Sequence, residues 1–444
     1  MPALERLQHS VDLFGRDKRQ VAISGSVVEV TPTFFRTAGL SNFVNLGDCV
    51  GIDTSRGEML AQVVRLDQQG AIVKAFDNNC GAGLGARVRA VGPIELSPHD
   101  SWKGRVIDAF ARPVDGQGPL LHGTRAYALD APPPQAMRRH PITTPVHTGV
   151  RAIDAFTPIC QGQRIGVFAG SGVGKSTLLE MLARSGGFSA AVICLVGERG
   201  REVRDFIDSI ADFGIEGLVT VVATADESPM MRRMAPLTAT AIAEFFRDEG
   251  ASVVLIVDSV TRYAHASREV ALASGEPAVA NGYTPSVFAD LPRLLERAGP
   301  GEGDAGAVTG IYSVLVDGDN HNDPIADCIR GTLDGHIVLE REIAEQGRYP
   351  AINVLKSISR LADRVWSPED RAMVMKIRAM LFKFEETRDL RMLGGYHAGG
   401  DPELDLSVHL TPIVYEALKQ TPRDPPSETA LAELERILGQ AVPR

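Results

Sequence analysis

The ten residues from Phe168 to Thr177, FAGSGVGKST, restrict the possible fold of this 444-residue chain more than any other stretch. A short apolar run over 164–168 precedes them, and a helical pattern over 177–184 follows. Strand, glycine-rich loop and helix in this order form a phosphate-binding loop, whose glycines let backbone N–H groups turn toward an anion at the helix N-terminus. A glycine-rich turn that binds no ligand would not explain why a strand, this loop and a helix occur together. The sequence therefore predicts that the chain binds a nucleoside triphosphate.

Residue types within this loop have separate predicted roles. Ala169 stands where the usual pattern begins with Gly, and its small side chain still fits. Lys175 is expected to reach the β- and γ-phosphates, and the Ser176 hydroxyl is expected to ligate Mg²⁺. The predicted nucleotide-binding residues of the loop are Gly170, Ser171, Gly172, Val173, Gly174, Lys175, Ser176 and Thr177.

The composition is that of an ordinary globular protein with two or three domains, with 44% hydrophobic and 23% charged residues. A formal net charge of −10 argues against broad nucleic-acid binding as the main task. Five scattered cysteines without a Cys-x-x-Cys pair favour free thiols in a reducing compartment. Residues 1–19 contain no signal-peptide core, and no later stretch is apolar enough to span a membrane. We expect a cytoplasmic protein.

Four regions follow one another along the chain. Residues 1–19 have apolar residues at helical spacing, which predicts either a short partner-binding helix or a terminus that only packs or frays. Short β-branched runs, punctuated by turn residues, predict a small closed β-barrel over 20–95. Residues 96–365 are predicted to form an α/β domain, and residues 366–444 a small helical domain.

Buried apolar strands that alternate with helices predict a mostly parallel sheet covered on both faces within the α/β domain. The expected strands of this sheet are 164–168, 190–196, 218–224, 253–258, 307–316 and 336–339, with helices over 231–246 and 286–298. The expected barrel strands are 21–30, 49–52, 59–66, 71–76 and 86–91. The expected C-terminal helices are 369–386, 413–419 and 428–440.

Three further segments carry candidate chemistry. The strand over 253–258 ends in Asp258, in the arrangement that holds Mg²⁺ beside the nucleotide in P-loop enzymes. Glu198 and Arg199 follow another strand, where a carboxylate can orient or deprotonate the attacking water and a cation can offset phosphate charge; a surface salt-bridge loop explains them equally well. Arg360 is either an ordinary surface residue or a cation delivered to a neighbouring subunit.

These segments together resemble the rotary-type ATPase family, in which a β-barrel, a RecA-like P-loop ATPase core and a helical domain follow in this order. Within it, the chain resembles the ATPases of type III protein export, and most of all their flagellar branch. The segments that carry the resemblance are FAGSGVGKST (168–177), GERGREV (197–203), DSVTRYA (258–264), GEP (275–277), GYTPSVF (282–288), LPRLLERAG (291–299), DPIAD (323–327), LDGHIVL (333–339), YPAI (349–352), SISR (357–360) and GGDPELD (399–405).

The resemblance implies specific roles for the candidate residues. It makes Glu198 the catalytic glutamate that activates water, Arg199 its phosphate-side arginine and Arg360 the arginine finger that acts on the adjacent subunit's site. It makes Lys175 the phosphate-binding lysine. Because one chain holds both Glu198 and Arg360, the resemblance implies a homo-oligomeric ring, in the family form a hexamer.

The same resemblance implies Mg·ATP as the bound nucleotide. Ser176 and Asp258 match the residues on the metal side, and Tyr349 matches the aromatic residue that packs against adenine, in keeping with the usual stacking preference of aromatic rings.

The resemblance thus predicts an ATP hydrolase that energises type III protein export for assembly of the bacterial flagellum. Three alternatives remain. The first is the equivalent ATPase of a virulence-type secretion system. The second is a RecA-like hexameric RNA helicase, which the acidic balance and the absence of clustered aromatic and basic residues in the barrel disfavour. The third is a nucleotide-binding regulator without turnover, which Glu198 and Arg360 together disfavour.

The expected partners also follow from the resemblance alone. They are a regulatory stator-like export protein at the N-terminus, the membrane proteins of the export gate, and export chaperones with their substrates, and no specific nucleic acid. The expected location is the cytoplasmic face of the export apparatus.

Overall fold

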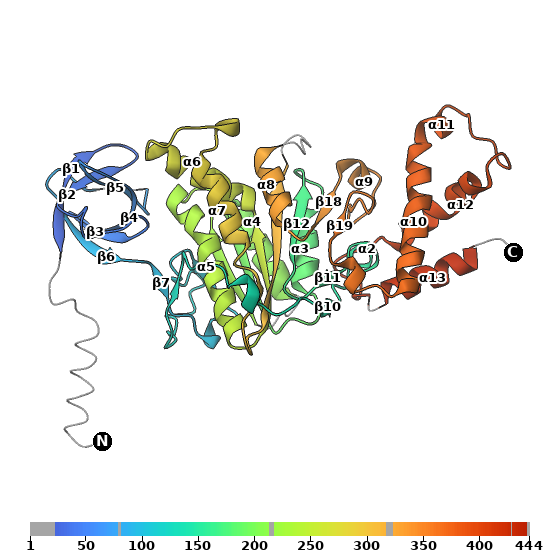
Figure 1. The fold of residues 1–444 in the computed structure, drawn as a ribbon, viewed down its shortest axis with the longest axis horizontal. Coiled ribbons are helices and arrows are strands. Elements are labelled where there is room, and N and C mark those ends of the chain that lie inside the picture. The colour runs from blue at the N-terminus through green and yellow to red at the C-terminus, as the bar shows by residue number, and fades with distance from the viewer. Residues whose placement is uncertain (1–22, 79–80, 213–216, 317–322, 428, 442–444) are drawn as a thin grey trace, which may run out of the picture. The chain divides into compact units, whose positions relative to one another are not determined.

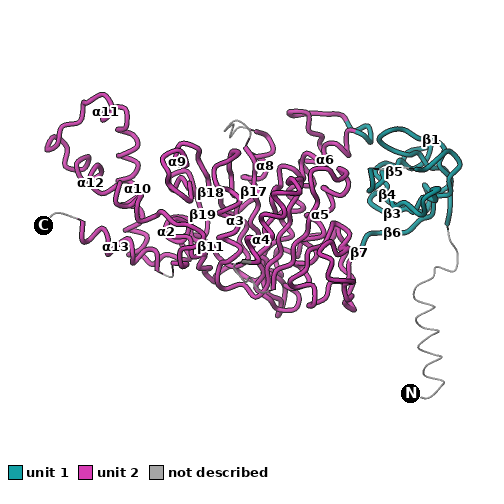
Figure 2. The backbone as a smooth tube through the Cα atoms, turned by 180° about the vertical axis from the view of Figure 1, so that it is seen from behind, with its two compact units in different colours: residues 1–94, 273–276 teal, residues 95–272, 277–444 magenta. Residues whose placement is uncertain are grey.

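The computed structural model describes residues 23–78, 81–212, 217–316, 323–427 and 429–441. The helix expected over 1–19 lies outside the described residues. Contacts divide the chain into two compact units, which Figure 2 shows in separate colours: 1–94 with 273–276, and 95–272 with 277–444. The domain boundaries expected at 95 and 365 stay predictions.

The first unit is a closed six-stranded barrel, as the sequence predicts. Its strands pair in the order β1-β2-β5-β4-β3-β6. The barrel interior is filled by small and β-branched side chains, among them Val50, Ile52, Val63 and Val73, each at most 1% exposed. Closing the sheet leaves no unpaired strand edge. The strands are β1 (Ser24–Val30), β2 (Phe35–Ala38), β3 (Cys49–Thr54), β4 (Gly57–Asp67), β5 (Gly70–Ala75) and β6 (Arg87–Gly92).

The second unit is built on a nine-stranded sheet with the order β19-β18-β12-β17-β15-β13-β14-β8, to which β16 adds by pairing with β17. The neighbours from β18 to β8 are parallel, and only β19 and β16 pair antiparallel. The strands are β8 (Val106–Asp108), β12 (Arg164–Ala169), β13 (Ala190–Val196), β14 (Leu218–Ala223), β15 (Ser252–Asp258), β16 (Gly299–Pro300), β17 (Ala307–Leu315), β18 (Gly335–Leu339) and β19 (Ile358–Ser359).

Helices cover this sheet, which explains the continuous apolar sequence of its strands. Every residue of β13 and β14 is buried, as expected for strands covered on both faces. The longest of these helices, α5, starts where Ser228 accepts a hydrogen bond from the Met231 N–H at 3.1 Å. The helices, visible in Figure 1, are α2 (Arg151–Phe156), α3 (Lys175–Ala183), α4 (Gly200–Asp212), α5 (Pro229–Asp248), α6 (Val260–Ala273), α7 (Pro285–Leu295), α8 (Pro324–Thr332) and α9 (Arg341–Glu345).

The C-terminal helices share a continuous hydrophobic core with the sheet. Val374, Leu381 and Val414 belong to the same buried cluster as Ile165 and Ile337 of β12 and β18. Short strand pairs, β7 (Glu95–Leu96) with β9 (Tyr127–Ala128) and β10 (Pro145–Val146) with β11 (Ile159–Cys160), complete the unit. The C-terminal helices are α10 (Pro368–Glu386), α11 (Arg388–Met392), α12 (Pro402–Ala417) and α13 (Ala430–Ala441). None of the helices among the described residues is long and apolar enough to cross a membrane.

Two of the differences from the sequence-based expectation have a clear physical reason. Strand β2 was not expected because it is only four residues long. Helix α12 begins at Pro402, eleven residues before the expected start at 413. The expected start was wrong because a proline usually interrupts a helix, whereas Pro412 lies in the interior of α12. The actual N-terminus is set by Asp401, whose carboxylate accepts hydrogen bonds from the N–H groups of Glu403 and Leu404 at 3.0 and 3.1 Å.

A buried ion pair joins α5 to the residues after α7. Arg297, 1% exposed, donates from Nε and Nη2 to the carboxylate of Glu244 at 2.9 and 2.6 Å, and its Nη1 donates to the Leu129 carbonyl. Its fork geometry matches the carboxylate, so each charge depends on the other for compensation.

We therefore expect Arg297→Met to lower the free energy of unfolding by about 3–5 kcal/mol, because it leaves the Glu244 carboxylate buried without its counter-charge. The double variant Arg297→Met/Glu244→Leu should regain a large part of this loss. Urea unfolding followed by tryptophan fluorescence measures it, since the two tryptophans of the chain, Trp102 and Trp366, both lie in the second unit. A double variant no more stable than the single one would contradict the expectation.

Candidate nucleotide-binding site

The loop between β12 and α3 has the conformation that an anion-binding loop requires. Gly172 and Gly174 adopt φ angles of 78° and 88°, in the left-handed region that glycine tolerates without strain. Gly174 is the N-cap of α3, and its carbonyl accepts the Leu178 N–H at 3.1 Å. Val173 is buried and anchors the loop, whereas Ser176 and Thr177 are exposed in the first turn of α3. The predicted loop therefore ends at the open N-terminus of a helix.

Three charged side chains from different elements meet directly beside this loop. The Lys175 Nζ donates a hydrogen bond to Asp258 Oδ1 and lies 3.8 Å from Glu198 Oε1. Asp258 ends β15, and its carboxylate also accepts the Ser313 hydroxyl of β17 at 2.5 Å. The side chains of Lys175, Glu198 and Asp258 are only 11, 13 and 4% exposed. The structure thus brings together three of the predicted site residues.

The protonation of Glu198 is balanced near neutrality. The pKa of this carboxyl is raised to about 7, chiefly by burial. The negative charge of Asp258 also raises the pKa, because it disfavours a second negative charge nearby. The positive charges of Lys175 and Arg262 lower the pKa and offset part of the shift. A carboxyl in this range can hold or release a proton at physiological pH.

A cleft of about 220 Å³ lies beside the cluster, between α3 and α4. Ser176, Glu198 and Asp258 all line it, so a hydroxyl and two carboxylates face one space. Oxygen donors of this kind suit Mg²⁺, which keeps several waters and takes few ligands from protein when substrate phosphates supply the rest. No cluster of three or more His, Cys, Asp or Glu side chains able to hold a metal occurs in the described part of the chain. The remaining lining residues are Glu180, Leu195, Glu202, Val203, Asp205 and Phe206.

Tyr349 lies next to the loop, beside Gly174. A Cβ added to Gly174 would be 3.4 Å from Cδ1 of this ring, so the ring packs against the loop, and 45% of Tyr349 remains exposed. The Tyr349 carbonyl accepts the Gln420 N–H at 2.8 Å, which ties it to the segment after α12. An exposed aromatic face beside the loop is suited to stacking a planar base.

The two predicted arginines do not join the cluster in the same chain. The Arg199 side chain is 82% exposed, with Glu202 at 3.5 Å as its ion-pair partner. Arg360 is exposed, and its backbone N–H bonds to the Asp334 carbonyl, while the Asp334 N–H bonds to the Arg164 carbonyl at the start of β12. The phosphate loop follows the other end of β12, roughly 17 Å away at 3.3 Å per residue. Arg360 therefore lies at the amino ends of the parallel strands, whereas the loop that precedes Lys175 lies at their carboxyl ends.

One residue in the cluster had no predicted role. Arg262, in the first turn of α6, places Nη2 3.3 Å from Glu198 Oε2, and its Nη1 donates to the Gly197 carbonyl. The signal was present, since Arg262 follows Asp258 by four residues and the helix after a strand starts at the strand's carboxyl edge. The contact with Glu198 itself depends on the pairing of β13 with β15, which local sequence does not display.

Comparison with known proteins extends these observations to the whole chain. Residues 149–359 match the ATP synthase alpha/beta family, nucleotide-binding domain, and residues 366–436 match the T3SS EscN ATPase C-terminal domain. The chain is 52% identical over 98% of its length to the flagellum-specific ATP synthase of Agrobacterium fabrum, covering 92% of that protein. It is 46% identical over 82% of its length to the SPI-2 type 3 secretion system ATPase of Salmonella typhimurium, covering 84% of it.

Two solved structures are similar in fold and sequence. The assembled ATPase EscN from the type III secretion system of enteropathogenic E. coli superposes with a TM-score of 0.86 at 37% identity, covering 93% of this chain and 100% of that one. EscN in complex with its central stalk EscO gives a TM-score of 0.84 at 36% identity, with the same coverage. The expected fold, a RecA-like core with an N-terminal barrel and C-terminal helices, is confirmed.

The contact between Arg262 and Glu198 predicts a measurable shift. We expect Arg262→Gln to raise the pKa of Glu198 above about 7, because removing a nearby cation disfavours the carboxylate. A ¹³C NMR titration of glutamate side-chain carboxyls measures it, with Glu198→Gln used to assign the signal.

Arg204→Gln is the matched control, because Arg204 is 76% exposed on α4 and pairs with Asp208 at 2.8 Å. It should leave the Glu198 titration in place. An unchanged or lowered pKa in Arg262→Gln would show that Arg262 does not set the charge state of Glu198.

Proposed function

Because this chain belongs to the family of flagellum-specific ATP synthases and type III secretion ATPases, and is therefore an ATP hydrolase, we propose that it energises type III protein export during assembly of the bacterial flagellum. One observation carries the flagellar assignment: 52% identity to a flagellum-specific relative, maintained over 98% of the chain.

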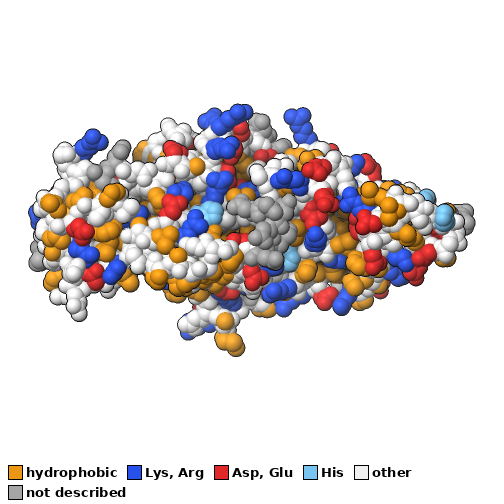
Figure 3. Space-filling view, turned by 90° about the horizontal axis from the view of Figure 1, so that it is seen from above, with side chains coloured by type: hydrophobic (Ala, Val, Ile, Leu, Met, Phe, Trp, Pro, Cys, Tyr) orange, Lys and Arg blue, Asp and Glu red, His pale blue; other side chains and the backbone are white. Residues whose placement is uncertain are grey.

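The virulence-type alternative has weaker support. Its representative from Salmonella typhimurium is 46% identical, but over 82% of the chain. The RNA-helicase alternative has no supporting observation. On the face shown in Figure 3, basic side chains are interspersed with acidic ones and form no continuous stripe along which a nucleic-acid backbone would run.

Nucleotide binding uses the charges already present in the cluster. The N–H groups at the start of α3 receive the phosphates, and Lys175 exchanges the carboxylate of Asp258 for phosphate oxygens. This exchange leaves Asp258 and the Ser176 hydroxyl free to hold Mg²⁺, which neutralises charge on the phosphates when it is bound. Tyr349 stacks on the adenine ring.

Glu198 is positioned to act on the attacking water. Its carboxylate faces the same cleft as Ser176 and Asp258, and with a pKa of about 7 it is poised to orient the water and accept its proton. Arg262 holds the Glu198 carboxylate in place and acts as a positioning residue. Arg199, which is free to turn from its exposed position, is the phosphate-side arginine.

The position of Arg360 supports a role in the site of a second chain. A side chain that starts at one edge of the sheet cannot cross roughly 17 Å of strand to the phosphate loop of its own chain. We therefore assign Arg360 to the site of an adjacent subunit, where it offsets the charge that develops on the transferred phosphoryl group. A homo-oligomeric ring, in hexameric form, supplies every site with one Arg360. EscN, a relative of this chain, was solved as an assembled ATPase and in complex with its central stalk EscO.

The partners expected for this chain remain part of the proposal. They are a stator-like regulator at the N-terminus, the membrane proteins of the export gate, and export chaperones with their substrates. The corresponding location is the cytoplasmic face of the export apparatus.

The catalytic role of Glu198 is tested by Glu198→Gln, which keeps the size of the side chain and removes its basicity. We expect ATP turnover to fall by a factor of about 10² or more, with ATP binding retained. A bacterium that carries this allele in place of its own should make the protein at normal levels and assemble no flagellar filament.

Arg204→Gln again serves as the control, and it should preserve both turnover and filaments. A Glu198→Gln enzyme with native turnover would refute the assigned catalytic role. A strain with the inactive allele that still assembles filaments would refute the export function and leave the ATPase activity standing.

A further inference from the structure

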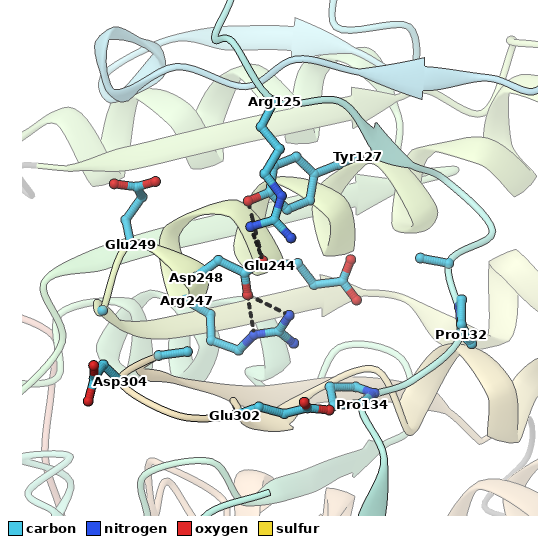
Figure 4. Close-up of a pocket in the computed structure, with 13 residues that line it drawn as sticks. Arg125, Tyr127, Pro132, Pro134, Glu244, Arg247, Asp248, Glu249, Glu302 and Asp304 are labelled. Carbon is cyan, nitrogen blue, oxygen red and sulfur yellow. Dashed lines mark hydrogen bonds and ion pairs between the residues drawn. The ribbon is translucent and has the colours of Figure 1, made fainter. Parts of the chain in front are cut away.

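The second unit contains another large pocket, of about 730 Å³, at the C-terminal end of α5 (Figure 4). Its walls come from the segment over 125–134, from the end of α5 and the residues after it, 244–250, and from the turn over 302–305. Helix α5 ends just before the first residue of β15, Ser252, whereas the nucleotide cleft lies at the last residue, Asp258. The pocket thus lies at the amino ends of the parallel strands, and the phosphate loop lies at their carboxyl ends.

Five carboxylates line this pocket, and three of them are compensated by the chain itself. Glu244 is paired with Arg297 behind the wall. Asp248 receives two cations, Arg125 at 3.0 Å and Arg247 at 2.8 Å. The third, Glu302, lies 3.7 Å from Arg138 and accepts the backbone N–H of Gln135 at 3.2 Å.

Two carboxylates remain without such compensation. Glu249 and Asp304 are exposed, and their carboxylates form no hydrogen bond or ion pair with any residue that the structure describes. Both lie on the left of Arg247 in Figure 4. The C-terminal end of the 20-residue helix α5 adds further negative potential here. This part of the pocket therefore favours a cation.

Arg247 also lines this pocket, and one of its donor atoms is unsatisfied. Arg247 is 8% exposed, and its Nε and Nη2 donate to Asp248 Oδ1 at 3.0 and 2.8 Å. Its Nη1 is buried and has no hydrogen-bond partner among the described residues. Burying an N–H group without an acceptor costs free energy of folding, and a ligand oxygen that accepted its hydrogen bond would remove this cost. The pocket thus combines two uncompensated carboxylates, which favour a cation, with an unsatisfied donor, which favours an acceptor oxygen.

The remaining wall is suited to a hydrocarbon chain. Tyr127, Pro132 and Pro134 line the pocket, and the Tyr127 hydroxyl is held by Asp248 at 3.3 Å. Arginine and lysine place their methylene stems along such apolar surfaces while the charged end reaches a carboxylate.

We propose that this pocket docks an extended, basic segment of a partner polypeptide. An arginine or lysine side chain of that segment runs along Tyr127 and the two prolines and ends at Glu249 and Asp304. A main-chain carbonyl of the segment accepts the free hydrogen of Arg247 Nη1. A polypeptide is the occupant because it carries a cation and a carbonyl a few bonds apart, and because the volume exceeds what one cationic group fills. The proposal does not depend on the export function.

The test measures calorimetric binding of the full-length protein to the peptide Ala-Arg-Ala-Arg-Ala, acetylated and amidated at its ends. The matched probe replaces both arginines by citrulline, which keeps the shape and removes the charge. We expect the arginine peptide to bind at least tenfold more tightly than the citrulline peptide, and to bind more weakly as salt rises. Glu249→Gln/Asp304→Asn should weaken binding of the arginine peptide tenfold or more.

Glu435→Gln/Asp389→Asn removes the same charge from exposed positions on α13 and α11 and should bind like the native chain. Both variants should retain native ATP turnover, which shows that they fold. Equal affinity for the two peptides, or native affinity in Glu249→Gln/Asp304→Asn, would overturn the proposal. Free argininamide or spermidine binding as tightly as the peptide would overturn the polypeptide as occupant, and so would displacement of the peptide by an RNA oligonucleotide.

Discussion

The contact of Lys175 with Asp258, with Glu198 beside it, is the interaction on which the rest of the site depends. Two carboxylates this close, and this buried, repel each other, and a single ammonium group between them offsets the repulsion. The same arrangement prepares the site for its ligand. In the proposed mechanism, phosphate oxygens compete for the Lys175 ammonium, and this competition frees the Asp258 carboxylate for a metal ion. The pKa of Glu198 is about 7, and Arg262 of α6 contacts its carboxylate.

The parallel sheet decides which groups can meet. The carboxyl ends of β12, β13 and β15 lie at one edge, and so the phosphate loop, Glu198 and Asp258 converge there although they are far apart in the sequence. Arg360 and the pocket at the end of α5 lie at the other edge. A residue at that edge is remote from its own nucleotide and is available to another chain. This sheet topology is the reason for the proposed assignment of Arg360 to a neighbouring site.

Much of this architecture could be predicted from local sequence. The phosphate loop has a strong pattern, and strands such as β13 are apolar throughout because both faces are covered. The short strand β2 and the true start of α12 could not be predicted, because one has too few residues for a pattern and the other continues through Pro412. Contacts between distant segments, such as Ser313 with Asp258, depend on strand order, which the sequence does not display. The exposed position of Arg199 and the free Nη1 of Arg247 likewise depend on three-dimensional packing.

The central claim, that each site is completed by a neighbouring chain, is tested most directly by mixing two inactive variants. Arg360→Ala keeps its own Glu198, and Glu198→Gln keeps its own Arg360. In a mixed ring, about a quarter of the interfaces join an intact Glu198 to an intact Arg360, since each interface takes its two chains at random. The account predicts that equal mixing restores up to about a quarter of the native ATP turnover. No recovery on mixing, from variants shown to assemble together, would contradict it.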